Sequence, residues 1–245
     1  MRFGKIDYLN LAPFDVFIKS YPTSSGFKKF LQLHKSYPAK LNQEFFFQRI
    51  DAGFISSIAG RDFFLKKKNA LSGIIAKGSV WSVITIPNQQ KSDAQSATSN
   101  ALCKILGLQG EVLIGDRALQ YRYQKGMHVD MGEIWYQKEH LPFVFGLLCF
   151  HKNEEFYTKI SKIFNQKRIK IPQYILEQYA KRLGIDKKYI LEYLTHIYYK
   201  IGTKEFLGLK RFYRQLLLKN IKGPMRFNFS QNLQTSTQNT NKEMQ

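Results

Sequence analysis

Small polar side chains that follow short apolar segments are the part of this 245-residue sequence that could do chemistry. Asn10, in DYLN, follows a predicted short strand at the start of the chain, and Ser56 follows GFI. Ser82 lies between large apolar residues in VWSVITI, and Asp116 follows EVLI in IGDRAL. Amide, hydroxyl and carboxyl groups orient ligand oxygens by hydrogen bonding. The pattern therefore favours a site that binds and positions a polar ligand.

Each of these side chains also has a structural explanation. Asn is a common turn former, and a Ser in a buried strand is often bonded to the backbone. Asp116 could pair with Arg117 or cap the turn that follows it. The sequence alone leaves both interpretations open at each position.

Three hydroxyl groups within four residues mark the segment SATSNALCKIL. Ser96, Thr98 and Ser99 stand at the start of a predicted helix that ends near Gly107. A helix N-terminus offers unpaired N–H groups and a partial positive charge, which favour a carboxylate or phosphate. Because three hydroxyls are more than a cap needs, the segment favours anion binding.

The sequence lacks the patterns of several other catalytic classes. GxGxxG, GxxxxGKS and GxSxG are absent, which removes the main sequence support for nucleotide-fold enzymes and nucleophile-elbow hydrolases. The five histidines are scattered, and Cys103 and Cys149 do not have zinc spacing. We therefore expect no metal and no cofactor.

The charge of the chain is strongly basic, with 38 Lys and Arg against 18 Asp and Glu and a net charge of +20. The positive electrostatic field of such a chain attracts anionic partners: nucleic acid, acidic lipid or a polyanionic metabolite. A composition rich in Lys, Asn, Ile, Phe and Tyr would explain the same excess without any partner.

A predicted helical hairpin around LGIDKKYILEYL supports one nucleic-acid alternative. Its Ala, Gly and apolar spacing fits a helix-turn-helix DNA-binding regulator, with Lys187 and Lys188 near the start of the second helix. Ordinary helical hairpins share this spacing, and Glu192 would repel phosphate.

The elements that must position the polar side chains alternate between strand and helix in the first half of the chain. The patterns predict strands over residues 2–8, 30–37, 51–60, 72–78, 81–87, 111–116 and 141–150. They predict helices over residues 14–20, 38–50, 101–108, 130–140, 154–165, 172–183, 186–200 and 203–219. This order predicts an α/β protein with parallel sheets, whose ligands lie beyond the carboxyl ends of the strands.

The same order predicts two lobes, with ITIP and FVFGLLCF as the paired crossings between them. We expect the first lobe to comprise residues 1–85 and 147–228, and the second residues 86–146. Residues 229–245 are rich in Gln, Asn, Ser and Thr, so we predict a disordered tail.

The start of the chain does not have the apolar run of a secretory signal peptide, because Lys5, Asp7 and Asn10 interrupt it. No window approaches the roughly 18–20 apolar residues that a membrane span needs. We therefore expect a cytoplasmic protein without a membrane partner.

Taken together, the segments GKIDYLN, DAGFISS, VWSVIT, SATS, VLIGDRAL, DMGEIW and LPFVFGLL resemble, in this order, the chorismate dehydratases of the futalosine route to menaquinone. The resemblance covers roughly residues 2–222. It implies a two-lobed fold similar to type II periplasmic binding proteins, with a ligand cleft between the lobes. It also implies a lyase that dehydrates chorismate to 3-[(1-carboxyvinyl)oxy]benzoate, a small dicarboxylate substrate and no nucleic-acid partner. One departure is SDAQSATS, where the family commonly has a Gly-rich start.

The resemblance carries the family's functional residues onto Asn10 and Ser82. Asn10 would orient the leaving hydroxyl and the enolpyruvyl arm, and Ser82 would hold a carboxylate or assist proton transfer. No protein base is evident, so a substrate carboxylate could take the proton. The residues expected to bind the substrate are Ser56, Ser96, Thr98, Ser99 and Asp116.

Two further functions share the implied fold. One is an enzyme similar to the sister family that makes 1,4-dihydroxy-6-naphthoate. The other is a non-catalytic protein that binds an anion without turnover.

Overall fold

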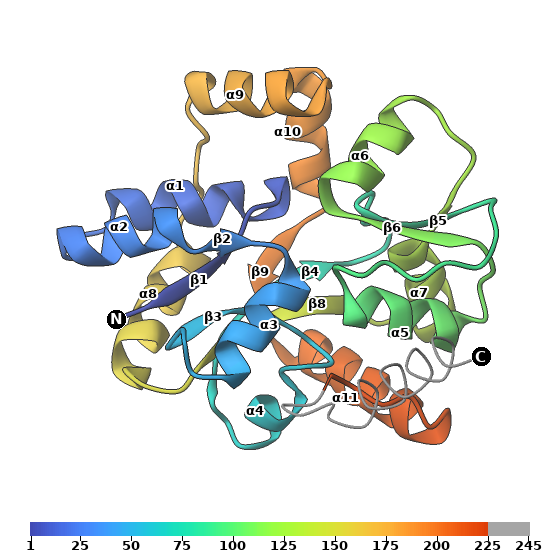
Figure 1. Ribbon diagram of the computed structural model, residues 1–245, viewed down its shortest axis with the longest axis horizontal. Helices are drawn as coiled ribbons and strands as arrows, with labels where there is room; N and C mark the ends of the chain where they lie inside the picture. The colour runs from blue at the N-terminus through green and yellow to red at the C-terminus, as the bar shows by residue number, and fades with distance from the viewer. Residues whose placement is uncertain (225–245) are drawn as a thin grey trace, which may run out of the picture.

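Two β-sheets form the frame of the computed structural model, which describes residues 1–224 (Figure 1). The larger sheet has the order β2-β1-β3-β8-β4-β9, and the smaller has the order β6-β5-β7. The strands are β1 (Phe3–Ile6), β2 (Lys35–Ser36), β3 (Ala52–Ser56), β4 (Asn69–Ala76), β5 (Val83–Ile86), β6 (Glu111–Ile114), β7 (Val129–Asp130), β8 (Phe143–Phe150) and β9 (Tyr198–Lys200).

Helices surround both sheets. They are η1, a 3-10 helix (Leu9–Leu11), α1 (Ala12–Ser20), α2 (Ser25–Leu33), α3 (Pro38–Phe46), α4 (Arg61–Leu65), α5 (Ala97–Leu106), α6 (Gly115–Tyr123), α7 (Met131–Glu139), α8 (Glu154–Gln166), α9 (Gln173–Leu183), α10 (Lys187–Thr195) and α11 (Thr203–Leu218). No helix within residues 1–224 has the length and apolar character that crossing a membrane requires.

The chain passes between the two sheets twice, which produces the predicted two-lobed architecture. It leaves the larger sheet between β4 and β5 through residues 77–82 and returns between α7 and β8 through residues 140–142. In Figure 1 the smaller sheet with α5, α6 and α7 lies to one side of the larger sheet. The lobe boundaries at residues 85 and 147 stay predictions, and the predicted tail at 229–245 lies outside the described residues.

The prediction of parallel sheets is wrong for most of the strand pairs. β1 runs parallel to β2 and β3, but β8 runs antiparallel to β3 and β4, and β4 runs antiparallel to β9. In the smaller sheet β5 is antiparallel to β6 and to β7. The β8 strand returns from the other lobe, so it enters the larger sheet in the opposite direction to β3.

Two predicted elements also differ from the structure. Of the strand expected at 30–37, only Lys35–Ser36 form a strand, β2, while residues 30–33 are the end of α2. The N-cap of α2, Ser24, accepts a hydrogen bond from the Phe27 N–H, and one face of α2 buries Phe27 and Leu31. The helix expected at 186–200 stops at Thr195, because the following residues form β9 and pair with β4 at the sheet edge.

An aromatic cluster holds β1 against the first helices. Phe3 and Phe14 stack with ring centroids 5.6 Å apart, and Phe14 meets Phe54 edge-on at 5.0 Å. All four residues of β1 are buried, including Lys5, whose ammonium group pairs with Asp15 at 2.7 Å. The packing of β1 fixes the start of the turn that carries Asn10.

Candidate functional site

A cavity of about 40 Å³ lies between the two sheets. Both lobes contribute to its wall, which consists of Ile6, Tyr8, Asn10, Pro38, Ser56, Ile74, Val80, Ser82, Val83, Ser96, Ser99, Ile114, Gly115, Phe145 and Gly146. Ligand pockets usually enclose about 300–1,000 Å³. The structure therefore shows the lobes closed, and they must part to admit a ligand larger than a few atoms.

Five of the seven predicted site residues share this wall: Asn10, Ser56, Ser82, Ser96 and Ser99. Two larger hollows, of about 650 and 700 Å³, have none of the seven in their walls. The parallel pairing of β1 with β3 explains why Asn10 and Ser56 share this wall, since Ser56 ends β3 and Asn10 follows β1 at the same sheet edge.

The other two predicted residues, Thr98 and Asp116, are not part of the wall. The Thr98 Oγ1 accepts a hydrogen bond from the Ile58 N–H at 3.1 Å, and the Asp116 Oδ1 accepts one from the Leu9 N–H at 3.0 Å. Both bonds join a residue of one lobe to a residue of the other. Substrate contact by these two side chains stays a prediction, while their observed role is to hold the lobes together.

The Asn10 turn is held from two directions. Tyr199 donates its hydroxyl to the Asn10 carbonyl at 2.6 Å, and Leu9 beside it is tied to Asp116. The Asn10 side-chain oxygen is buried and has no hydrogen-bond partner among the described residues. An unpaired buried acceptor costs about 1–3 kcal/mol, so this oxygen is suited to a ligand that donates a hydrogen.

The loop before Ser82 folds around the carboxylate of Asp130. This carboxylate accepts hydrogen bonds from the Ser79 hydroxyl at 2.9 Å and from the Val80 and Trp81 N–H groups, the latter at 2.7 Å. Asp130 is also the N-cap of α7. One buried carboxylate therefore fixes the loop and the start of α7 together.

Trp81 has a strained backbone directly before Ser82. Its φ of +63° lies in the left-handed region, which bulky residues rarely occupy. The indole is held in place by the Arg122 guanidinium 4.5 Å from its ring and by Tyr189, which stacks on it at 5.0 Å. This strain and these contacts set the direction in which Ser82 leaves the loop.

Ser96 acts as the N-cap of α5, as the capping interpretation expected. Its hydroxyl oxygen accepts the Ser99 N–H at 3.2 Å and donates its hydrogen to the Ser99 hydroxyl at 2.8 Å. Asp93, at the departure from the family pattern, is buried and pairs with Arg117. Burial raises the pKa of Asp93, against the opposing effects of the Gln95 N–H and Arg117.

Tyr8 closes the cavity on one side. Its hydroxyl donates to the Gln95 side chain at 2.6 Å, across the two lobes. Its ring packs against Gly115, which has a φ of +59° and where a Cβ would lie 2.8 Å from the ring. Burial raises the pKa of Tyr8 far above its ordinary value, so the hydroxyl stays a donor.

Arg182 of α9 bridges both lobes at the entrance to the Asn10 turn. Its guanidinium lies 2.5 Å from the Asp116 carboxylate, 3.6 Å from that of Asp7 and 4.7 Å from the Tyr179 ring. Burial raises the pKa of Asp116, while the Leu9 N–H and Arg182 act in the opposite direction. In Figure 1 α9 extends from above α1 towards α6, consistent with this bridging position.

The wall of the cavity is electrically neutral. It contains no Lys, Arg, His, Cys, Asp or Glu among the described residues. No group of three potential metal-binding side chains occurs within residues 1–224. What the wall offers a ligand is hydroxyls, one amide and the start of α5.

Sequence reasoning missed several residues that hold the site. Asp130 lies in DMGEIW, where a carboxylate before a predicted helix is an N-cap signal. Arg182, Tyr193 and Tyr199 gave no comparable signal, because their contacts with the site span more than 60 residues of sequence.

Solved structures share the fold of this chain. Protein AF1704 from Archaeoglobus fulgidus superposes with a TM-score of 0.64 at 14% identity, covering 90% of this chain and 97% of that one. The periplasmic aliphatic sulphonate binding protein SsuA from Escherichia coli gives 0.56 at 14% identity, covering 94% and 96%. The two sheets and these superpositions thus place the chain in the class of two-lobed proteins with the periplasmic-binding-protein fold, as the sequence predicted.

Sequence comparison identifies the family within that class. A family model described as menaquinone biosynthesis matches residues 106–217. A chorismate dehydratase from Campylobacter jejuni is 42% identical over 90% of this chain and 100% of its own length. One from Thermus thermophilus is 25% identical over 84% of this chain and 91% of its own. The chain belongs to the chorismate dehydratase family, which confirms the resemblance seen in the sequence motifs.

Proposed function

We propose that this protein dehydrates chorismate to 3-[(1-carboxyvinyl)oxy]benzoate, as a lyase of menaquinone biosynthesis. The match to a chorismate dehydratase along that relative's whole length supports this activity. The unpaired Asn10 oxygen in a cavity shared with Ser82 is the structural observation that carries it. It provides an acceptor for a substrate hydroxyl where the hydroxyl must be held for elimination.

The reaction needs positioning more than a strong nucleophile. Removal of the ring proton spreads charge towards the ring carboxylate as a dienolate. The C–O bond of the neighbouring hydroxyl then breaks, the ring becomes aromatic and one water leaves. Asn10 orients the hydroxyl, and the hydroxyl groups of Ser56, Ser82 and Ser99 bind carboxylate oxygens, so that charge is stabilised by preorganised donors.

The proton acceptor is a carboxylate of the substrate itself. The described residues of the cavity wall include no carboxylate, imidazole or amine. The hydroxyl of Ser82 accepts a hydrogen bond from the Tyr193 phenol and lies near the Val80 carbonyl, and neither group is a base that could activate it. The same proton can return to the departing oxygen, which balances the loss of one water.

The setting of the reaction follows from the same proposal. We assign the protein to the cytoplasm, with a small dicarboxylate as its partner and no nucleic acid. The α9–α10 hairpin, which prompted the DNA-binding alternative, buries Ile190 and Tyr193 against the body of the protein. Its Lys187 pairs with Glu177 at 3.1 Å.

Incubation of the purified protein with chorismate, with mass detection of the product, tests the proposal. We expect an aromatic product lighter than chorismate by one water. Binding of chorismate without turnover would instead identify a non-catalytic anion-binding protein. Turnover restricted to the substrate of the 1,4-dihydroxy-6-naphthoate synthases would place the chain with that sister activity.

A further inference from the structure

Three serine hydroxyls of the cavity wall have the same hydrogen-bonding arrangement. Each accepts a hydrogen bond from a protein donor through its oxygen. The pairs are Asn42 Nδ2 to Ser56 Oγ at 2.8 Å, Tyr193 Oη to Ser82 Oγ at 3.0 Å, and Ser96 Oγ to Ser99 Oγ at 2.8 Å. A serine has one hydroxyl hydrogen and two lone pairs. A protein donor on a lone pair therefore leaves the hydrogen available to another acceptor.

The hydrogen of Ser82 has only a weak competitor inside the protein. The Val80 carbonyl lies 3.4 Å from the Ser82 hydroxyl, and it already accepts the Ser82 N–H at 2.7 Å. A hydrogen bond of 3.4 Å is much longer than the usual distance for an O–H donor. A ligand oxygen in the cavity would therefore take this hydrogen in preference to Val80.

The direction of the Asn42 bond is fixed by a second contact. Its Oδ1 accepts the Ser56 N–H at 3.1 Å while its Nδ2 donates to the Ser56 hydroxyl. Rotation of the amide would break both bonds, and the side chain has no room to move because Asn42 is 2% exposed. Ser56 must therefore receive a hydrogen bond from Asn42.

Tyr193 is fixed in the same sense. It is 1% exposed, and burial raises the pKa of its phenol far above the ordinary value. The phenol therefore keeps its hydrogen, which it donates to the Ser82 hydroxyl. Neither Tyr193 nor Asn42 belongs to the wall of the cavity, so both act through the serine that each contacts.

We propose that Asn42 and Tyr193 are positioning residues that leave the hydroxyl hydrogens of Ser56 and Ser82 directed at substrate oxygens. This inference deepens the proposed function and rests on it. The cleft then binds a dianion through neutral O–H groups. Their hydrogens point at the ligand because Asn42 and Tyr193 already donate to the serine oxygens. This arrangement also explains why the wall needs no cation: a Lys or Arg beside a substrate carboxylate would lower that carboxylate's pKa by about 1–3 units and weaken it as a base.

The cleanest test removes one oxygen with Tyr193→Phe. We expect kcat/KM for chorismate to fall about tenfold, because Ser82 is no longer held in its donor orientation. Tyr213→Phe is the matched control, since it removes another buried phenol, which donates to the Ser57 carbonyl at 3.0 Å, and neither Tyr213 nor Ser57 belongs to the cavity wall. The control should lower Tm by a similar amount and leave kcat/KM unchanged.

A double-mutant cycle separates positioning from a general loss of stability. In a Ser82→Ala background Tyr193→Phe should cause no further loss of kcat/KM, while its effect on Tm persists. An equal loss in both backgrounds would overturn the proposal for Tyr193, as would full activity of the single variant.

Asn42→Asp tests the other pair by reversing its polarity. The new carboxylate still accepts the Ser56 N–H but also accepts the Ser56 hydroxyl hydrogen, which is then withdrawn from the substrate. We expect at least a tenfold loss of kcat/KM, and wild-type activity would refute the role of Asn42.

Failure of the proposed function would be distinguishable from failure of this inference. If the wild-type protein binds chorismate without turning it over, the proposed activity is wrong. The Kd of chorismate is then measured by calorimetry for the wild type and for each variant of the same double-mutant cycle. A rise in Kd on Tyr193→Phe that disappears in the Ser82→Ala background supports the positioning role. An unchanged Kd rejects it.

Discussion

The side-chain oxygen of Asn10 is the one buried side-chain atom without any hydrogen-bond partner among the described residues of the cavity wall. Its backbone carbonyl is occupied by Tyr199, so the side chain is free to serve a ligand. The serines beside it differ, because each already accepts a hydrogen bond from the protein. The site thus combines one unpaired acceptor with several prepared donors.

Replacement of Asn10 should separate catalysis from folding. We expect Asn10→Ala to lower kcat by about 10²–10³, the usual loss when one preorganised hydrogen-bonding group is removed from a reacting centre. Asn10→Asp should be at least as damaging, because it places a negative charge beside a dianion. Steady-state kinetics with chorismate measures both.

Asn69→Ala provides the control for these variants. Asn69 begins β4 outside the cavity, and its amide donates only to the neighbouring Ala70 carbonyl in the bonds seen here. Its kinetics should match the wild type. Activity of Asn10→Ala at the wild-type level would show that the turn is structural.

Single residues also show how far the sequence could predict the site. Asn10, after β1, and Ser56, at the end of β3, share one cavity wall, and the strands that carry them are readable from local apolar patterns. Thr98 and Asp116, whose contact with substrate stays a prediction, form hydrogen bonds that join the lobes. Hydroxyl spacing locates a helix start, but the face on which each side chain lies depends on the lobe packed against it.

Among the elements, the α9–α10 hairpin contributes most to the geometry of the cleft. Through Arg182 it contacts a carboxylate from each lobe, and through Tyr193 it reaches Ser82. Because Arg182 remains 41% exposed, solvent screens its ion pairs and their strength falls with salt. The hairpin therefore holds the closed form by an interaction that a ligand or salt can shift.

Loss of this contact should favour the open form. We expect Arg182→Gln to raise KM for chorismate several-fold with a smaller change in kcat, because closure then costs more. Lys181→Gln, one residue earlier on the exposed side of the same helix, removes the same charge and should leave KM unchanged. A rise in KM of equal size in both variants would point to long-range charge instead of the bridge.

The contact between β1 and α1 gives a second prediction, on acid stability. Burial acts to raise the pKa of Asp15, but Lys5 and Lys19 outweigh it and hold the pKa below its ordinary 3.8. A carboxyl with a depressed pKa contributes stability that is present above 3.8 and is lost as pH falls through the folded-state value.

Asp15→Asn should therefore lower stability at neutral pH and flatten the loss of stability below pH 4 or thereabouts. Urea unfolding midpoints measured across the acid range check this expectation. Asp62→Asn, on the short helix α4, is the comparison variant and should retain the wild-type slope. An unchanged slope in Asp15→Asn would mean that other carboxyls govern acid unfolding.

Element prediction failed where distant segments decide the outcome. Alternation over residues 30–37 fits a strand, yet residues 30–33 extend a helix that begins with the Ser24 cap, and only Lys35–Ser36 form a strand. Residues 186–200 have helical spacing throughout, but β4 supplies a pairing partner for Tyr198 and Lys200. In both places local patterns were compatible with two structures, and tertiary contacts selected one.

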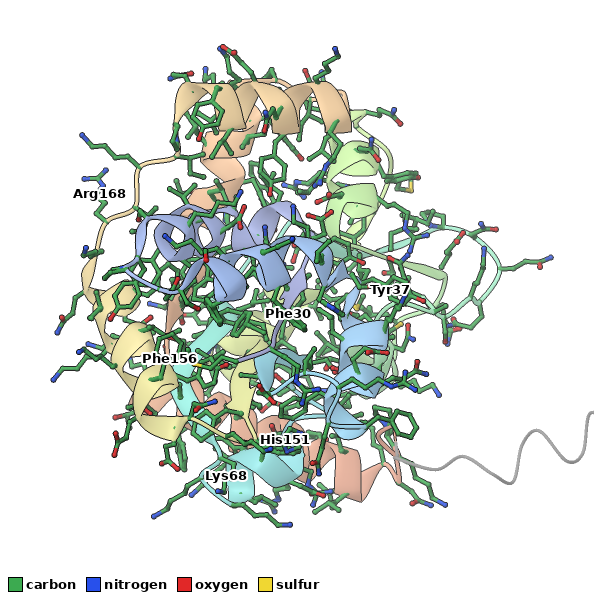
Figure 2. The ribbon with its side chains drawn as sticks, turned by 60° about the vertical axis from the view of Figure 1, so that its left-hand side comes forward. Phe30, Tyr37, Lys68, His151, Phe156 and Arg168 are labelled. Carbon is green, nitrogen blue, oxygen red and sulfur yellow. The ribbon has the colours of Figure 1, made fainter. Side chains whose placement is uncertain are left out.

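For the molecule as a whole, the charge and the site lie in different places. The net charge is +20, whereas the described wall of the cavity is neutral. Figure 2 shows Arg168, in the connection between α8 and α9, pointing outward from the body of the protein. The positive charge therefore acts from the surface, where it attracts a dianion without pairing with it in the cleft.

This separation predicts that salt affects encounter more than chemistry. Between about 50 mM and about 500 mM NaCl we expect kcat/KM to fall and kcat to change little, since the Debye length shrinks well below the size of the protein. Stopped-flow binding of chorismate should show the change in the association rate. If kcat fell in parallel with kcat/KM, Lys or Arg side chains would have to act at the reacting site itself.

The 40 Å³ cavity has a consequence for inhibitor discovery. Compounds docked into this shape would be rejected for size, including those that mimic the substrate. The useful target is the parted form, and a compound that spans both walls gains affinity from the contacts of Tyr8 with Gln95 and of Leu9 with Asp116 as they form around it. Screens for inhibitors should therefore select compounds by a slow dissociation rate and not by a fast association rate.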